Sequence, residues 1–146
     1  MPTIDLRVGT WKLNVAKSKF SPVWLAAMNV APPKEETVVV RELGTDEVEL
    51  TITGAQTDGK PIAVKETFPR QGGIVKIQQG ALPDGMTIVS TRIDPNNSYA
   101  TFMLNGKQVF VSQGVISKNG KSMQVTTQGT DAQGKPFEQL LVFVKQ

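Results

Sequence analysis

Two residue types that carry much of protein chemistry are missing from this chain: it has no cysteine and no histidine. Without cysteine it forms no disulfide, no thiolate metal site and no thiol nucleophile. Without histidine it lacks the usual general base near neutral pH, the Ser–His pair and most zinc or non-haem iron sites. We therefore expect a protein that is not an enzyme and that has no metal site and no cofactor.

Long apolar runs and clustered charge are also lacking. No stretch approaches the roughly 20 apolar residues of a membrane-spanning helix, and Met1–Arg7 has no apolar signal region. A secreted protein whose signal has been removed would read the same, so cytoplasmic and secreted locations both stay open. The net charge of +3 comes from lysines and arginines scattered along the chain, and aromatic residues are only 6%. We expect no nucleic-acid partner, and nothing in the sequence indicates an oligomeric state.

What the sequence does contain is a period-two pattern. Trp11, Leu13 and Val15 alternate with Lys12 and Asn14, as in strands with one face buried and one in water. Asp-Gly and Asn-Gly pairs at 58–59, 105–106 and 119–120 predict type I′ hairpin turns. The expected strands are 8–15, 37–43, 47–54, 61–68, 73–79, 86–93, 98–104, 107–117, 121–129 and 136–145.

These strands predict one all-β domain over residues 1–146. Short antiparallel strands joined by tight turns form an up-and-down meander, and closure into a barrel removes its exposed edges. One short helix near residues 21–29 is expected to interrupt the meander. Ser21 is a good N-cap with Pro22 in the first helical position, and the segment ends at Asn29 before Pro32-Pro33.

A resemblance to a known family rests on several motifs taken in order. They are Gly9-x-Trp11 on the first strand, Lys17–Pro22, Thr91–Asp94, Val115–Lys121 and Gly129–Pro136. Together they resemble bacterial lipocalin-like proteins of uncharacterised function, which are calycins, over essentially the whole chain. The resemblance implies a lipocalin/fatty-acid-binding-protein-like barrel of 8–10 strands.

The same resemblance implies a role for the first-strand tryptophan. In calycins this side chain closes one end of the barrel against a basic residue near the end of the last strand. Trp11 matches the tryptophan, and Lys145 is the nearby basic residue. The last strand reads Leu141–Val144, where fatty-acid-binding proteins have an Arg-x-Tyr that holds the ligand carboxylate. Classical fatty-acid capture is therefore not implied.

Ligand-binding candidates come from the helix and from positions in phase with apolar strand faces. A two-turn helix cannot bury an apolar stripe by itself, so its apolar residues must cover a barrel end, gate a cavity or meet a partner. Polar groups in phase with a core need partners, unless a bulge or strand end turns them outward. Methionine and tyrosine suit a variable apolar lining. The candidates are Trp24, Leu25, Met28, Glu66, Phe68, Met86, Arg92, Tyr99, Met103 and Gln113.

Two functions are compatible with this pattern. The leading hypothesis is a binding module that takes a small hydrophobic or amphipathic ligand inside the barrel, with the helix near its mouth. The alternative is a structural or protein-interaction barrel with a filled core and no small-molecule ligand.

Overall fold

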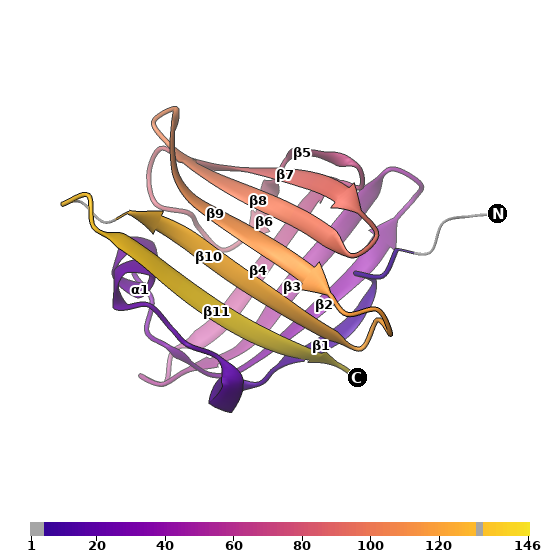
Figure 1. Ribbon diagram of the computed structural model, residues 1–146, viewed down its shortest axis with the longest axis horizontal. Helices are drawn as coiled ribbons and strands as arrows, with labels where there is room; N and C mark the ends of the chain where they lie inside the picture. The colour runs from indigo at the N-terminus through magenta and orange to yellow at the C-terminus, as the bar shows by residue number, and fades with distance from the viewer. Residues whose placement is uncertain (1–4, 131–132) are drawn as a thin grey trace.

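The chain folds into a single curled antiparallel sheet (Figure 1). The computed structural model describes residues 5–130 and 133–146, and within these ranges eleven strands are present, against the 8–10 expected. The strands are β1 (Gly9–Leu13), β2 (Pro33–Leu43), β3 (Glu47–Gln56), β4 (Pro61–Pro69), β5 (Gly72–Ile74), β6 (Lys76–Gln79), β7 (Met86–Asp94), β8 (Asn97–Leu104), β9 (Lys107–Ile116), β10 (Ser122–Thr130) and β11 (Pro136–Lys145).

Neighbouring strands are hydrogen-bonded to each other all around the barrel except at one boundary, which we call the seam. The strand order is β5-β7-β8-β9-β10-β11-β1-β2-β3-β4-β6, so β5 and β6 are the two edges of the sheet. β5 pairs with β7 and β6 pairs with β4, while only the buried Val75 separates β5 from β6 in the chain. The prediction of one strand over 73–79 is wrong for this reason: the segment crosses the seam and divides into two short strands.

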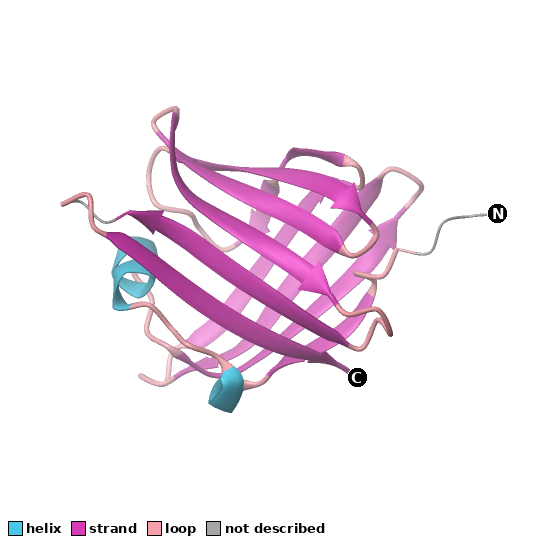
Figure 2. Cartoon of the chain, viewed as in Figure 1, coloured by secondary structure: helices cyan, strands magenta, loops and turns pink. Residues whose placement is uncertain are grey.

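Two short helical segments interrupt the meander (Figure 2). The predicted helix is present as α1, Pro22–Met28, with Ser21 as its N-cap and Asn29 in the left-handed conformation at its end. A 3-10 turn, η1 (Val15–Lys17), ends the first strand earlier than the predicted 8–15. Among the described residues, no helix is long and apolar enough to cross a membrane.

The barrel has two ends, which we name by what lies there. α1 lies at the helix end, where β2 begins and β3 ends. The segment Asp5–Val8 lies at the opposite N-terminal end, from which β1 enters the sheet (Figure 1). The strands of eight or more residues therefore carry one terminus to each end, and side chains on their inner faces line the path between them.

One of the three predicted type I′ turns has the backbone that this turn requires. Asn105 and Gly106 both have positive φ, 51° and 83°, because type I′ needs φ > 0 at both central residues. At 58–59 and 119–120 only the glycine has positive φ. Those two connections are tight turns of another kind, although they join the strands that were expected.

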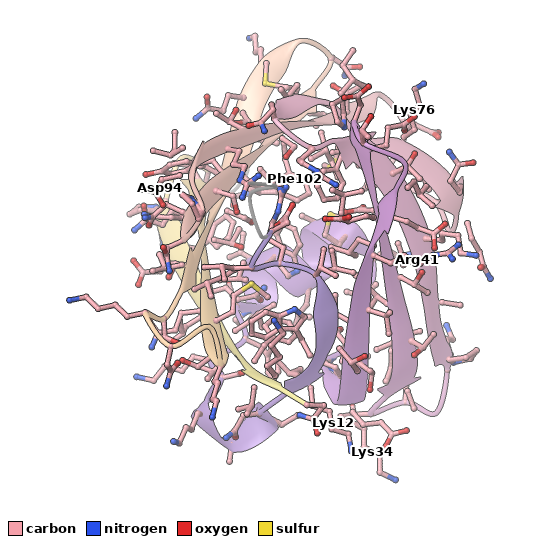
Figure 3. All side chains as sticks on the ribbon, turned by 90° about the vertical axis from the view of Figure 1, so that its right-hand side faces the viewer. Lys12, Lys34, Arg41, Lys76, Asp94 and Phe102 are labelled. Carbon is pink, nitrogen blue, oxygen red and sulfur yellow. The ribbon has the colours of Figure 1, made fainter. Side chains whose placement is uncertain are left out.

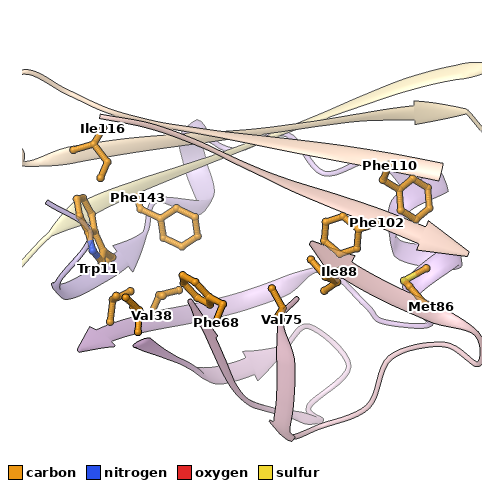
Figure 4. Close-up of a cluster of buried hydrophobic side chains, with 12 residues drawn as sticks. Trp11, Val38, Phe68, Val75, Met86, Ile88, Phe102, Phe110, Ile116 and Phe143 are labelled. Atoms are coloured by element: carbon orange, nitrogen blue, oxygen red, sulfur yellow. The ribbon is translucent and has the colours of Figure 1, made fainter. Parts of the chain in front are cut away.

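Alternation along the strands separates a packed interior from a charged exterior. The buried apolar cluster runs from Trp11, Phe143 and Ile116 near the N-terminal end to Phe102, Phe110 and Met86 near the helix end (Figure 4). Viewed from the N-terminal side, Phe102 lies within the ring of strands, whereas Lys12, Arg41 and Lys76 lie around its outside (Figure 3). This is the one-face-buried pattern on which the strand predictions rested.

Candidate functional site

The helix end is closed by α1, which two hydrogen-bonding side chains hold in place. The Ser21 hydroxyl accepts hydrogen bonds from the backbone N–H groups of Val23 (3.2 Å) and Trp24 (3.4 Å). The Ser21 N–H in turn donates to Oε1 of Gln139 on β11, at 3.0 Å. Gln139 is only 2% exposed. The polar residue in phase with the apolar face of the last strand therefore anchors the helix to the barrel.

Trp24 is the side chain by which α1 covers the interior. Its ring lies 5.3 Å from the ring of Phe102 and 5.3 Å from that of Phe110, both in edge-to-face contact. Such pairs contribute about 0.5–1.5 kcal/mol beyond the area they bury. Met28 also packs against the core. Of the three roles open to this helix on the sequence, the observed packing is that of a cover on one barrel end.

A cavity of about 120 Å³ lies directly under this cover. Trp24 and Leu25 of α1 line it on one side, and Gln139, Leu141 and Glu36 are among the strand residues that line it. Glu36 was missed by the sequence analysis because the strand was expected to begin at residue 37. The available signal was the spacing of two that places residue 36 in phase with Val38 and Val40, which are both 5% exposed.

Two glutamates on the inner face lack any counter-charge. Burial raises the pKa of Glu36 and of Glu66 to about 7, and neither carboxyl has a hydrogen-bond or ionic partner among the described residues that would oppose the shift. Both side chains nevertheless keep part of their surface accessible. Of the two, Glu36 lines the cavity under α1.

The two carboxyl groups lie at different depths. Gly54 of β3 is paired with Glu36 of β2 on one side and with Ile62 of β4 on the other, so Glu36 and Ile62 lie at the same height in the barrel. Ile62 is four residues from Glu66 along β4. At about 3.3 Å per residue this is about 13 Å. Glu36 therefore belongs to the cavity under α1, and Glu66 lies deeper, beside Ile77 of β6 at the seam.

The N-terminal end is closed by Trp11 and the residues around it. Trp11 is fully buried, its Nε1–H donates to the carbonyl of Arg7 at 2.9 Å, and Nζ of Lys145 lies 5.3 Å from its ring centroid. The guanidinium of Arg7 lies 5.5 Å over the Phe68 ring. The packing implied by the calycin resemblance, a first-strand tryptophan against a basic residue of the last strand, is thus present in this chain.

Arg92 reaches the same end and has an ionic partner there. It faces inward with the buried Met86 and Ile88, which is one of the two orientations that the sequence left open. Its Nη1 lies 3.8 Å from Oδ2 of Asp5, a residue outside the predicted set. Burial acts to raise the pKa of Asp5, but the hydrogen bonds and charge of Arg7 outweigh it and hold this pKa below its ordinary value.

Three predicted lining residues point away from the interior. Phe102, Phe110 and Ser112 are buried, so by alternation Tyr99, Met103 and Gln113 lie on the outer face. Tyr99 is paired with Gln113 there. The prediction that these three line the interior is corrected. For Gln113 the cause is a bulge in β9. The pairing passes from Phe102–Phe110 to Met103–Gln108 and skips Val109, so a spacing of two counted from Val109 no longer gives the inward positions.

The remaining predicted residues are divided between the two ends. Trp24, Leu25 and Met28 lie at the helix end, and Met86 is 9% exposed within the core. Phe68, 7% exposed, and Arg92 lie toward the N-terminal end. Among the described residues, no group of three acidic, histidine or cysteine side chains is placed to hold a metal ion.

The fold is that of a calycin-type β-barrel, the architecture of lipocalins and fatty-acid-binding proteins, and the Trp11–Lys145 packing agrees with it. A mutant of the fluorescent protein UnaG is similar, at 15% identity and a TM-score of 0.65, covering 99% of this chain and 99% of that one. Wild-type UnaG has 16% identity, a TM-score of 0.61 and coverages of 95% and 96%. At these identities the likeness concerns the fold. No family model matches the chain, and no curated protein sequence matches it either.

Proposed function

We propose that this protein is a binding module that takes a small, mostly apolar molecule into the helix end of its barrel, beneath α1. We also infer that it belongs with the bacterial lipocalin-like proteins that its motifs resemble. The observation that carries the proposal is Glu36, an unpartnered carboxyl in the cavity under Trp24. An uncompensated buried charge is costly, and a ligand that supplies a donor there would remove that cost.

This placement of Glu36 gives the ligand a chemical description. Its body is apolar, to fit between Trp24, Leu25 and Leu141. Its polar part donates a hydrogen bond or carries a positive charge, as an amine does, to meet the carboxyl. Ligand pockets usually measure about 300–1,000 Å³, so a cavity of about 120 Å³ requires that Trp24 and α1 shift outward when the ligand enters.

The test uses two dyes with the same fluorophore and opposite charge, dansylcadaverine with its amine and dansylglycine with its carboxylate. We expect saturable binding of the amine dye with blue-shifted emission, and weaker binding of the carboxylate dye. Glu36→Gln should weaken the amine dye about tenfold, as the loss of one charge-assisted hydrogen bond predicts. Glu35→Gln is the matched control, because the neighbouring Glu35 is exposed on the outer face.

The alternative function is a filled barrel with no small-molecule ligand. The twelve buried apolar residues of the core and the small volume under α1 favour it. If neither dye binds saturably, this alternative holds and the proposed function is refuted. If both dyes bind equally and Glu36→Gln changes neither, the barrel binds ligands but the role given to Glu36 is wrong.

A further inference from the structure

A second and larger cavity lies at the N-terminal end, away from α1. Its volume is about 500 Å³, within the range of small-molecule pockets. Three connections form its wall: Gly44 and Thr45 between β2 and β3, Arg70 and Gln71 between β4 and β5, and the segment Arg92–Pro95 at the end of β7. Residues from distant parts of the chain thus meet around one space.

Two arginines in this wall have hydrogen-bond donors that nothing uses. Nε and Nη2 of Arg70, and Nη2 of Arg92, are buried and have no hydrogen-bond partner among the described residues. The side chain of Arg92 is only 8% exposed. Buried guanidinium donors without acceptors are rare, because each forfeits a strong charge-assisted bond.

The orphaned atoms of Arg70 have a recognisable geometry. Nε–H and Nη2–H are the two parallel donors of a guanidinium edge, which matches the two oxygens of a carboxylate or phosphate. Lysine has no such edge. The unused pair therefore indicates a bidentate oxyanion partner rather than a single acceptor.

The acidic groups nearby are already engaged or poorly aligned. Asp5 is taken by Arg7: its Oδ1 accepts from the backbone N and Nε of Arg7, both at 3.0 Å, and its Oδ2 accepts from Nη2 at 2.8 Å. Asp94, which lines the cavity, accepts hydrogen bonds from the N–H groups of Asn96 and Asn97. Neither carboxylate is therefore available to accept hydrogen bonds from the unused donors of Arg70 and Arg92.

Among the described residues, Glu42 is the carboxylate that forms an ion pair with Arg70. Its Oε1 lies 3.1 Å from Nη2 of Arg70, but Nη2 makes no aligned hydrogen bond. The Glu42 side chain is 47% exposed and lines the same cavity, so it can rotate into solvent. It covers the position that a better-aligned oxyanion would take.

We propose that this cavity is a second binding site, which holds the carboxylate or phosphate group of a small organic molecule between Arg70 and Arg92 in place of Glu42. Ile93, 60% exposed, and Pro95 form an apolar side of the same cavity. The molecule's apolar body lies against them. This site is separate from the one under α1 and binds an anionic group rather than a cationic one. The two proposals are therefore tested independently of each other.

The test follows the arginine Nε–Hε signals by ¹H–¹⁵N NMR while inorganic phosphate or benzoate is added at constant ionic strength. We expect saturable shifts at Arg70 and Arg92. Tighter binding of benzoate would identify a carboxylate with an apolar body, and tighter binding of phosphate a phosphate ester. Arg70→Lys keeps the charge and loses the paired edge, and should weaken binding about tenfold. Glu42→Gln removes the competing charge and should strengthen binding.

Arg41→Lys is the matched control. Arg41 is bonded to Glu49 at 2.6 Å and its side chain is 62% exposed on the neighbouring outward position of β2, so its replacement should leave binding unchanged. The proposal is overturned if the shifts stay linear in concentration for both anions, or if Arg41→Lys weakens binding as much as Arg70→Lys does. Should Arg70→Lys fail to fold, Glu42→Gln decides: affinity no higher than that of the wild type overturns the proposal.

Discussion

The two unpartnered glutamates should make the stability of this protein fall as pH rises toward neutrality. Burial raises the pKa of Glu36 and Glu66 from 4.5 to about 7, so the folded chain holds these protons more tightly than the unfolded chain does. Protons therefore favour folding. This contribution is fully present below pH 4.5 and is lost as pH rises through 7.

The size of the effect follows from the shift. One pKa unit corresponds to about 1.4 kcal/mol, so a shift from 4.5 to about 7 corresponds to about 3 kcal/mol for each glutamate at high pH. Small domains are stable by only about 5–15 kcal/mol. The loss from both groups, up to about 6 kcal/mol, would be a large part of that total.

The absence of histidine makes this effect measurable without interference. Between about pH 5.5 and 8, ordinary carboxyl groups stay ionised and lysines stay protonated, and only the terminal amino group otherwise titrates. The pKa values of Asp5 and Asp94 lie below their usual range, so the stability that these two ionised groups contribute is lost only in more acidic solution. The free energy of unfolding from urea titrations at several pH values therefore reports the two glutamates.

We expect Glu66→Gln to halve the slope of the unfolding free energy against pH, and the double variant with Glu36→Gln to flatten it. Glu35→Gln, an exposed neighbour, should leave the slope as in the wild type. A wild-type unfolding free energy that is constant between pH 5.5 and 8 would refute the reasoning. It would mean that both carboxyl groups reach water well enough to keep an ordinary pKa.

Three further predictions concern contacts at the two barrel ends and in the pairing of β2 with β3. Gln139→Leu removes the acceptor of the buried Ser21 N–H and should cost about 1–3 kcal/mol and speed hydrogen exchange at that amide; unchanged exchange would contradict the anchoring role. Trp11→Phe keeps an aromatic ring but loses the Nε1–H bond to the Arg7 carbonyl, and chemical denaturation should show a loss of at least about 1 kcal/mol. Gly54→Ala places a Cβ against the Glu35 carbonyl at a φ of 152° and should destabilise by about 1–3 kcal/mol or more; a thermal midpoint equal to that of the wild type would show that the strand pair shifts freely.

The features that sequence could predict are those set by nearby residues. Helix α1 follows from Ser21-Pro22 at its start and Asn29 at its end, and its observed bounds agree with the predicted 21–29. Most strands follow from alternation and glycine-containing turns. The phase of a regular apolar face also allowed inward positions for Glu66 and Arg92, but a bulge or strand end that turns each side chain outward was compatible with the same residues.

The features that sequence could not predict depend on how strands pair. The bulge at Val109 reverses the outward and inward positions that follow it, and nothing in the residues around it signals the skipped pairing. The division of 73–79 into β5 and β6 depends on which neighbours the two halves find. Arg70 and Arg92 are brought together by turns that are 22 positions apart, so their unused donors appear only in three dimensions.

The seam between β5 and β6 has a consequence for how much the barrel can hold. Everywhere else a change of circumference would break a ladder of backbone hydrogen bonds between paired strands. At the seam the described strands β5 and β6 are not paired with each other, and the chain alone connects the two sides, through Val75 and through the Arg70–Gln71 turn between β4 and β5. The circumference can therefore vary at this one line. Because Glu66 is paired with Ile77 of β6, a widening at the seam would change the surroundings of the deeper of the two buried carboxyl groups, and with them the burial that raises the pKa of Glu66.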